Sequence, residues 1–528
     1  MTKMKKTMNF LVLIASAIIL ICCSADDPLS FDNNGYSYGN NNGFNGGNSN
    51  TASTSQLTFS IDIDKTTAEP STTVTEYFPD SEDNLANNSF TTEVAIDLSN
   101  PTEKNENGVT VTVNGGHITA NHGSTKSVCY VVSGSTSNGS FTVVGDKKYE
   151  VKLNSVSITN PDSAAMNLLS SKRAYVVLNG SNTLTDGTSS QNNHKGALYC
   201  KGKLLMNGNG SLEVYGNYNN AIHCADYIVL RSGTNIYAKS TANHGIKAND
   251  GIYINGGILN VEVSANGAKG INCESNIIVN GGRTIVIATG SNGYEDGDTK
   301  RAKAIMCDSA YVQNGGEVRA YSKTSEGIES KTTIDITGGT VCAVASDDAI
   351  NSASTFTISG GYVMGYSTGN DGLDANGNFY IKGGLGYAIG TSSPELAIDA
   401  NTEGGYKLYG TGGTIVAVGG LEGGSSLSQA CYQSSSWSQS TWYALYNGDD
   451  LAFAFKTPSS AGSPLVVSTT STPTLSTGVS VSGGTPCFFG MGYVGGTVSG
   501  GSSVSLSSYT GGSAMGGGPG GGGPGGRW

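Results

Sequence analysis

Charged side chains are scarce in this sequence, where Asp, Glu, Lys and Arg together make up 13% of 528 residues. Glycine is very frequent, with 77 residues, and this combination favours many turns between short strands over a helical protein. Basic residues number 29 and acidic residues 41, which gives a net charge of −12. That charge argues against a nucleic-acid partner and favours an attraction for divalent cations.

Patterns typical of several common activities are absent as well. The sequence offers no Ser-His-Asp order, no phosphate-binding loop and no nucleotide-binding motif. The glycine-rich C-terminus is not a phosphate cradle, because no helix follows it. A leucine-rich repeat is excluded because we find neither its leucine framework nor its asparagine ladder.

The longest apolar run, residues 10–23, is too short to span a membrane comfortably and follows a basic start, so it predicts a signal peptide over residues 1–23. Its end, Leu20-Ile21-Cys22-Cys23, resembles a bacterial lipobox with Cys23 as the lipid-bearing residue. Cys22 is the poorer candidate, and an ordinary signal peptide with two incidental cysteines is the alternative. A lipid on Cys23 predicts membrane attachment through this anchor only.

The residues after the signal peptide predict a cell-surface location. Residues 24–27 form a short acidic tract that resembles the signal routing some lipoproteins to the outer face of the outer membrane. The segment 24–56 is rich in Asn, Gly and Ser and cannot bury a core, so it predicts a disordered tether.

One short pattern is repeated nine times between Ala164 and Ala375. Each copy holds three short β-branched runs separated by Asn, Gly or Gly-Gly. The central apolar residues of the first runs are Met166, Leu198, Ile222, Ile246, Ile271, Ile305, Ile328, Ile350 and Leu373. Their spacing of 22–25 residues, with three strands per period, predicts an all-β fold, a parallel β-helix whose coils stack about 4.8 Å apart.

The remaining segments predict the domain organisation. Two longer intervals correspond to loops at 186–194 and 291–301. The alternating segment 57–64 predicts a strand, and the β-helix is expected over residues 57–400, with irregular opening coils. Residues 401–511 keep strand-forming residues but lose the period, which predicts an additional C-terminal β region covering the last coil or packing on it. The Gly/Pro tail, 512–528, is expected to be disordered.

Four cysteines occupy one position of the repeat. Cys200, Cys224, Cys273 and Cys307 each lie two residues after the stacked apolar residue, so they face the core. We favour core filling over metal binding. Disulfides between Cys200 and Cys224 or between Cys273 and Cys307 are allowed by spacing, but stacked parallel strands give poor disulfide geometry.

The chemistry of the chain is concentrated in a column of outward-facing residues that flank each first run. From coil to coil the pairs are Asn220/His223, His244/Lys247, Lys269/Asn272, Lys303/Met306, Glu326/Glu329, Asp348/Asn351 and Asp371/Asp374, with Asp347 beside Asp348. The column is basic or neutral in the middle coils and acidic in the last three. Each ionised carboxylate pair would cost about 3.5 kcal/mol at 4.8 Å and an effective dielectric constant of 20.

A hard cation would compensate this repulsion. Calcium takes six to eight oxygen ligands in irregular arrangements. The predicted calcium ligands are Glu326, Glu329, Asp347, Asp348, Asn351, Asp371 and Asp374. A solvated acidic edge with raised pKa values is the alternative, and zinc is disfavoured because the column has no thiolates or paired histidines.

These motifs resemble the bacterial carbohydrate-binding domain-containing β-helix family. The resemblance rests on the x-G-I-x-A and I-x-I-x-G-G repeats, the strand 152–159, the element 179–186 and the Gly/Pro-rich tail, and covers about residues 57–515. It implies a right-handed helix with bound calcium, similar to family 9 polysaccharide lyases, that binds cellulose and acidic sugars. The coils at Asn220, His244, Lys269 and Lys303 depart from the acidic pattern of the family, so fewer calcium ions are expected.

Three functions remain open. The first is non-catalytic polysaccharide binding, with carbohydrate contacts from Lys247, Lys269, Lys303, His244 and Tyr199. The basic residues would hold a uronate carboxylate and the tyrosine would stack on a sugar. The second is a calcium-dependent lyase that abstracts a proton from a uronate, for which Lys303 lies one coil from Glu326. The third is a structural surface adhesin. Neither the glycan nor the oligomeric state is determined by the sequence.

Overall fold

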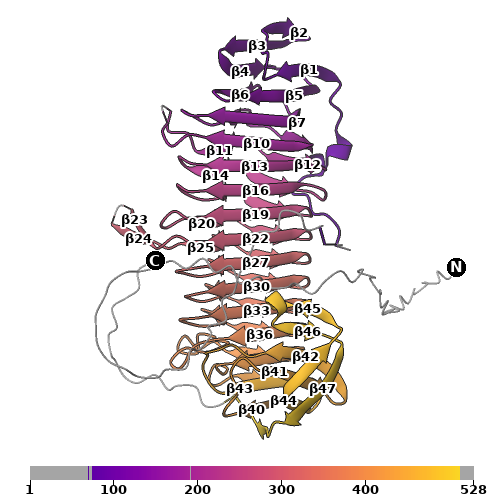
Figure 1. The fold of residues 1–528 in the computed structure, drawn as a ribbon, viewed down its shortest axis with the longest axis vertical. Coiled ribbons are helices and arrows are strands. Elements are labelled where there is room, and N and C mark those ends of the chain that lie inside the picture. Colours follow the sequence, from indigo (N-terminus) through magenta and orange to yellow (C-terminus); the bar gives the residue numbers. More distant parts are fainter. Residues whose placement is uncertain (1–68, 71–73, 191, 296, 512–528) are drawn as a thin grey trace, which may run out of the picture. The chain divides into compact units, whose positions relative to one another are not determined.

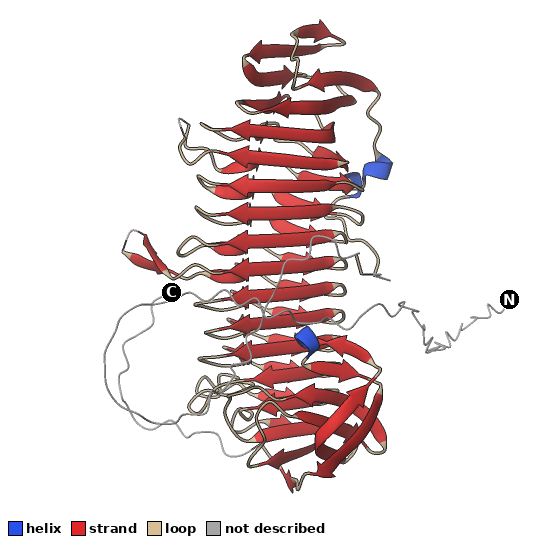
Figure 2. Ribbon diagram, viewed as in Figure 1, coloured by secondary structure: helices blue, strands red, loops and turns tan. Residues whose placement is uncertain are grey.

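The computed structural model describes residues 69–70, 74–190, 192–295 and 297–511. The predicted signal peptide with Cys23, the tether 24–56, the strand 57–64 and the tail 512–528 lie outside these ranges. The described residues form strands and three single-turn 3-10 helices, η1 (Ser81–Asp83), η2 (Leu85–Asn87) and η3 (Phe488–Gly490), with no α-helix among them (Figure 2). Within these ranges, no helix is long and apolar enough to cross a membrane.

Most strands stack into a parallel β-solenoid with three faces (Figure 1). The first face contains β4 (Gly116–Asn121), β6 (Gly139–Val144), β8 (Met166–Leu168), β11 (Gly196–Cys200), β14 (Asn220–Cys224), β17 (Ile246–Ala248), β20 (Lys269–Cys273), β25 (Lys303–Cys307), β28 (Ile328–Ser330), β31 (Ile350–Ser352) and β34 (Leu373–Ala375). The antiparallel strands β2 (Lys104–Glu106) and β3 (Val109–Asn114) precede it at the N-terminal end.

The other two faces carry the second and third strands of each coil. The second face contains β9 (Ala174–Asn179), β12 (Leu204–Gly208), β15 (Tyr227–Leu230), β18 (Gly251–Ile254), β21 (Ile277–Val279), β26 (Tyr311–Gln313), β29 (Ile334–Ile336), β32 (Phe356–Ile358) and β35 (Phe379–Ile381). The third contains β10 (Ser181–Asp186), β13 (Ser211–Gly216), β16 (Asn235–Ser240), β19 (Ile258–Val263), β22 (Arg283–Ala288), β27 (Glu317–Ser322), β30 (Thr340–Ala345), β33 (Tyr362–Ser367) and β36 (Leu385–Ile389). The opening strands β1 (Thr92–Asp97), β5 (Val128–Thr136) and β7 (Tyr149–Asn160) stack in parallel ahead of them.

The register of the first face confirms the predicted repeat. All nine central apolar residues, from Met166 to Leu373, pair directly with their counterparts in the adjacent coils. The column continues to Ile398 and Leu421 through isolated parallel bridges. Because these side chains are buried, each coil adds one apolar layer to a continuous core.

The turn after each second-face strand explains the Gly-Gly pairs. The second glycine adopts a positive φ, for example +74° at Gly282, which L-residues with side chains rarely adopt. Beside this turn lies an asparagine ladder, in which Asn280 Nδ2 donates to Asn255 Oδ1 and Asn314 Nδ2 donates to Asn280 Oδ1, both at 2.9 Å. The sequence-based statement that such a ladder is absent was therefore wrong, because stacking was needed to align these residues.

The four inward cysteines are buried free thiols, as core filling predicts. Cys200 pairs with Cys224 and Cys273 with Cys307 on neighbouring strands without forming disulfides. Burial raises the pKa of the Cys273 and Cys307 thiols to about 12, so both remain protonated near neutral pH.

Both predicted loops leave the solenoid between coils. The second contains a small hairpin, β23 (Gly293–Glu295) and β24 (Asp298–Lys300). Upstream of the solenoid strands, the described part of residues 69–90 packs along the second face. There the fully buried carboxylate of Asp83 accepts hydrogen bonds from Arg173 Nε and the Tyr227 hydroxyl, each at 2.8 Å.

Parallel pairing continues beyond residue 400, through β37 (Leu408–Gly410), β38 (Thr414–Val418) and β39 (Ser426–Leu427). Three antiparallel strands then follow, β40 (Ala430–Ser434), β43 (Leu465–Thr469) and β48 (Ser507–Ser508). A separate six-stranded antiparallel sheet, called here the C-terminal sheet, has the order β45 (Thr485–Cys487), β46 (Gly492–Val494), β42 (Asp450–Lys456), β41 (Trp442–Asn447), β44 (Pro473–Ser482) and β47 (Thr497–Ser503).

The C-terminal sheet packs on the third face of the last coils. Tyr387 of β36 has its ring centroid 5.7 Å from that of Phe453 and 5.5 Å from that of Phe455. These residues belong to one buried apolar cluster shared by the solenoid and the sheet. The sheet therefore covers apolar residues of the third face.

Candidate functional site

The predicted outward pairs do meet on the first face. Within one coil, the side chains on either side of the Gly/Ala-Ile pair converge, as when Asn351 Nδ2 donates to Asp348 Oδ2 at 2.8 Å. The intervening small residue faces inward: a Cβ built on Gly270 would lie 2.1 Å from Val286 Cγ1. We call the row of converging pairs from Asn220/His223 to Asp371/Asp374 the outward column.

Lys303 marks the border between the basic and acidic halves of the outward column. Its side chain is 4% exposed, and Nζ donates to Glu326 Oε1 at 3.1 Å and to the Glu329 carboxylate. Lys331 Nζ also donates to Glu329, at 2.6 Å. Burial would raise the pKa of Glu326, but Lys303 and the Ser325 hydroxyl hold it below its usual value. These two predicted calcium ligands are thus neutralised by the protein itself.

A similar ion pair involves Asp347, the residue beside the column. Arg301 contacts its carboxylate at 2.5 Å. The Asn370 side-chain amide donates to the other Asp347 oxygen at 2.8 Å. Asp347 is therefore held by protein donors and is set apart from the deeper carboxylates.

The next two coils hold carboxylates that no basic residue of the described chain pairs with. The Asn351 amide bridges Asp348 and Asp374, donating to their oxygens at 2.8 and 2.9 Å. The Asp371 backbone N–H donates to Asp348 Oδ1 at 3.2 Å. Burial, reinforced by neighbouring carboxylates, raises the pKa of Asp348 to about 7 and that of Asp371 to about 8.

Two further carboxylates, which the sequence reasoning missed, extend this acidic half. Asp399 and Glu422 follow Ile398 and Leu421 in the continued apolar column. Burial and Asp399 raise the pKa of Glu422 to about 8. The signal was present as Ala397-Ile398-Asp399-Ala400, which repeats the first-run pattern.

The oxygens of Asp371, Asp374 and Asp399 can bind one metal ion by their geometry. One oxygen from each lies within 4.8 Å of the others. Calcium binds oxygens at 2.3–2.6 Å, so ligands on opposite sides of one ion lie about 5 Å apart. We call Asp371, Asp374 and Asp399 the acidic cluster. Its donors are hard oxygens without thiolates or imidazoles, a set suited to calcium rather than zinc.

The basic half of the outward column presents hydrogen-bond donors. His244 Nδ1 accepts the Lys269 backbone N–H at 3.0 Å. Burial and the neighbouring Lys269 and Lys247 lower the pKa of His244 to about 3, so its imidazole is neutral. Its proton therefore resides on Nε2, which acts as a donor. Lys247 is paired with Glu274 at 2.6 Å.

Two other groups in this half lack partners among the described residues. Lys269 makes no ion pair there, and burial together with Lys303 lowers its pKa. The buried Nε2 of His223 also has no hydrogen-bond partner. Tyr199 lies beside this imidazole with ring centroids 5.6 Å apart. The predicted residues His244, Lys247, Lys269 and Tyr199 are therefore neighbours, whereas Lys303 is engaged by carboxylates.

A hydrogen-bonded chain of Ser190, His194 and Asp186 lies in the first loop, although the sequence offers no Ser-His-Asp order. His194 contacts Ser190 Oγ through Nδ1 and Asp186 Oδ2 through Nε2, both at 2.8 Å. Ser190 Oγ also accepts the backbone N–H groups of Asn192 and His194. Because its lone pairs are engaged by the loop backbone, this chain braces the loop rather than activating a nucleophile.

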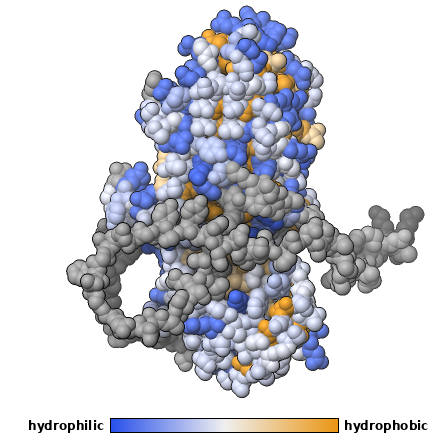
Figure 3. All heavy atoms as spheres, in the orientation of Figure 1, coloured by the Kyte–Doolittle hydropathy of each residue, from blue (hydrophilic) through white to orange (hydrophobic). Residues whose placement is uncertain are grey.

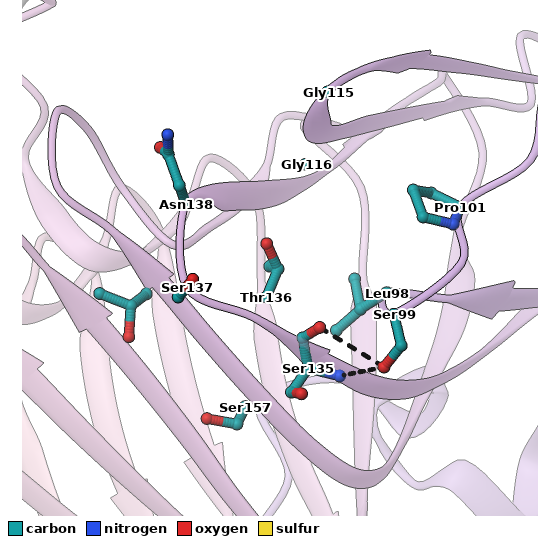
Figure 4. Close-up of a pocket in the computed structure, with 11 residues that line it drawn as sticks. Leu98, Ser99, Pro101, Gly115, Gly116, Ser135, Thr136, Ser137, Asn138 and Ser157 are labelled. Atoms are coloured by element: carbon teal, nitrogen blue, oxygen red, sulfur yellow. Dashed lines mark hydrogen bonds between the residues drawn. The ribbon is translucent and has the colours of Figure 1, made fainter.

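A shallow groove of about 660 Å³ lies near the opening coils (Figure 4). Its polar lining comes from hydroxyl and amide side chains, among them Ser135, Thr136, Ser137, Asn138 and Ser157. No predicted site residue lines it. The acidic cluster and the basic half of the outward column therefore remain the stronger candidate site.

A comparison with known protein families identifies the family of this chain. A family model described as "Carbohydrate-binding domain-containing protein" matches residues 105–372, slightly more than half of the chain. This chain belongs to that carbohydrate-binding family. The match includes Tyr199 and the outward column from Asn220 to Asp371, and it ends before Asp374, Asp399 and the C-terminal sheet.

The chain is similar to a solved structure, that of the polysaccharide lyase-like protein from C. thermocellum in a gadolinium derivative. It is 21% identical, with 55% of this chain and 92% of that chain covered and a TM-score of 0.32. No curated protein matches.

Proposed function

We propose that this protein binds polysaccharide without cleaving it, through the outward column of the first face, and that calcium occupies the acidic cluster. Membership of a carbohydrate-binding family carries the first part of this proposal. A lipid on Cys23 would hold the protein at the outer face of the outer membrane, with residues 24–56 as a spacer.

The calcium proposal is supported by uncompensated charge. Asp371, Asp374 and Asp399 bring oxygens within 4.8 Å of one another, and burial raises the pKa of Asp371 to about 8. A divalent cation would favour the ionised forms, since opposite charge lowers a carboxyl pKa. Bound calcium would also link neighbouring coils and offer open coordination positions to sugar oxygens. Asp348 and Glu422 border the cluster, and Glu326, Glu329 and Asp347 have protein cations instead.

The basic half would supply the contacts to an acidic sugar. Lys269 carries an ammonium with no ion pair among the described residues, and His244 presents an Nε2–H donor nearby. A uronate carboxylate would accept charge-assisted hydrogen bonds from Lys269. Tyr199, at the edge of this half, offers a ring face beside the sugar.

Non-catalytic binding is favoured over lysis by the position of Lys303. A lyase needs a basic side chain free to take a proton beside the metal. Lys303 is instead held by two carboxylates in the coils between the basic half and the acidic cluster. Among the described residues, no lysine or arginine pairs with the acidic cluster.

Thermal unfolding of residues 24–528 with calcium or excess chelator, each with and without polygalacturonate, tests this proposal. We expect chelator to lower the midpoint and polygalacturonate to raise it only with calcium, because ligands that bind the native state stabilise it. Unsaturated product absorbing in the ultraviolet would instead assign a calcium-dependent lyase. A midpoint that responds to neither calcium nor polysaccharide would leave a structural adhesin.

A further inference from the structure

The C-terminal sheet has one face that the solenoid does not cover. Side chains alternate along β41, and Tyr443 and Leu445 point into the cluster shared with the third face. Trp442, Ala444 and Tyr446 therefore point away from the solenoid. In Figure 1 this sheet lies in front of the last coils, and Figure 3 shows on that side a hydrophobic patch among residues of intermediate hydropathy.

The strand register places small residues at the centre of this outward face. One row of cross-strand partners runs through Pro486, Tyr493, Ala454, Ala444, Ser476 and Ser503, one from each of the six strands. The two alanines are fully buried although they face away from the solenoid. A methyl group in mid-sheet is covered only by larger neighbours on the same face.

Three aromatic side chains are in position to cover the alanines. Trp442 and Tyr446 flank Ala444 on β41, and Tyr493 is the cross-strand partner of Ala454. The rings of Trp442 and Tyr493 lie 5.4 Å apart between centroids. All three side chains are half-buried. The planes of the Trp442 and Tyr493 rings are inclined to each other by 47°, so the two rings form a tilted pair over the alanines that is partly open to solvent.

Internal packing does not engage the polar ends of these rings. Among the described residues, neither the Trp442 indole N–H nor the hydroxyls of Tyr446 and Tyr493 make a hydrogen bond. Trp437 differs, because its indole N–H donates to the Gly462 carbonyl at 2.9 Å. Trp437 is thus fastened to the fold, whereas the three outward aromatics keep both a ring face and a polar group for a ligand.

We propose that Trp442, Tyr446 and Tyr493 form a second carbohydrate-binding surface, which stacks on the ring faces of a neutral, unbranched polysaccharide and needs no calcium. This inference rests on the proposed function, because it assumes that the protein binds polysaccharide. The surface lies outside residues 105–372, the part that the family model matches.

The chemistry of the surface selects the ligand class. A pyranose ring with equatorial hydroxyls presents flat C–H faces, which pack on aromatic rings, and rim hydroxyls, which take hydrogen bonds. Lys456, the cross-strand partner of Trp442, offers a donor at the edge. The row across the sheet contains no carboxylate, so it offers no acidic ligand for a metal ion. A neutral β-linked glucan such as cellulose has these flat faces along its whole length.

The test is retention of residues 24–528 on microcrystalline cellulose in excess chelator. We expect the wild-type protein to bind cellulose without calcium. The double variant W442A/Y493A should lose at least about tenfold in affinity, because Trp and Tyr side chains contribute much of the binding energy where they contact a ligand. Y294A removes an 81% exposed tyrosine from the hairpin β23–β24 and should bind as wild type. W442F/Y493F retains the rings and should keep most of the affinity, which separates lost stacking from lost folding.

The results separate this inference from the proposed function when calcium-dependent binding of polygalacturonate is measured on the same samples. If W442A/Y493A binds cellulose like wild type, the aromatic surface is not a binding site. If wild type binds polygalacturonate with calcium but does not bind cellulose in chelator, the second site is overturned and the proposed function stands. Binding to neither polymer overturns both.

Discussion

At the scale of single residues, equivalent positions of the outward column hold side chains of opposite charge. Lys269, Lys303 and Glu326 occupy equivalent positions in successive coils, yet each has a different electrostatic environment. Lys269 lacks an ion pair among the described residues, Lys303 neutralises two carboxylates, and Glu326 depends on that neutralisation. The role of each side chain therefore comes from the coil next to it.

Replacing Lys303 by methionine tests its role as an internal cation. Removing one partner of a buried ion pair leaves uncompensated charge, so we expect K303M to lose about 3–5 kcal/mol of unfolding free energy. Chemical denaturation measures this loss. The triple variant K303M/E326Q/E329Q should recover much of it, because the unpaired charges are removed. A K303M protein as stable as wild type in chelator would contradict the assignment.

The carboxylates of Asp348 and Asp371 predict a pH dependence of the calcium-free protein. Their native pKa values, about 7 and about 8, lie above the ordinary aspartate value of 3.8. Between these limits the native state binds more protons than the unfolded state, so stability falls as pH rises. In chelator we expect a loss of more than about 2 kcal/mol from pH 5 to pH 8.

Denaturant titrations across this range provide the measurement, and D348N/D371N is the control. That variant should show a flatter profile, and calcium should flatten the wild-type profile at the upper end. A wild-type stability that rises with pH in chelator would mean that these carboxylates are not destabilised by burial.

At the scale of elements, the solenoid depends on what its turns and strands can fit. Glycine or alanine precedes each stacked apolar residue of the first face, because the following third-face strand leaves no room for a larger side chain. The Gly-Gly turns and the ladder of Asn255, Asn280 and Asn314 then align successive coils. Each coil thus contains the residues that set its alignment with the next coil.

Gly270→Ala tests the tight contact inside one coil. The new Cβ would lie 2.1 Å from Val286 Cγ1 and 2.7 Å from the Ala304 carbonyl oxygen, so the core must shift. Overpacking of this kind costs about 1–3 kcal/mol, measurable by denaturant unfolding. Gly386→Ala is the matched control, because nothing lies within 4 Å of its added Cβ. Equal stability of the two variants would refute the crowding argument.

At the scale of the whole described chain, the two proposed binding surfaces lie on different parts of the fold. The outward column runs along the first face, whereas the C-terminal sheet covers the third face of the last coils. The sheet therefore has a structural role in addition to the proposed binding role. It shields Tyr387, Met364 and other apolar residues that face away from the solenoid core.

A chain ending after Leu427 tests this shielding. It keeps the parallel strands but removes the sheet, so the apolar third face of the last coils becomes exposed. Large exposed apolar patches promote association. We expect increased binding of a hydrophobic dye and self-association by light scattering. Removing only residues 512–528 should have neither effect. A monomeric truncated chain that binds no dye would show that the sheet is dispensable.

The repeat made much of the fold and part of the site predictable. Equivalent residues recur every 22–25 positions, so the sequence alone aligned Ile305, Ile328 and Ile350 and grouped the outward pairs. Asp399 was missed although Ile398 follows Leu373 at the regular spacing, because Ile398 lies in an isolated bridge without an extended strand-forming run around it. The ladder at Asn255 was missed because asparagines in separate coils become neighbours only when the coils stack.

By itself, the sequence determined the parallel β-solenoid, its register and its buried cysteines, because local strand and turn preferences repeat and parallel stacking follows from them. Only the tertiary structure decided that Lys303 neutralises Glu326 and Glu329 and that Asp399 joins Asp371 and Asp374. It also decided where the C-terminal sheet packs. These outcomes depend on side-chain directions and on contacts between distant, non-repeating segments, for which no period in the sequence provides a guide.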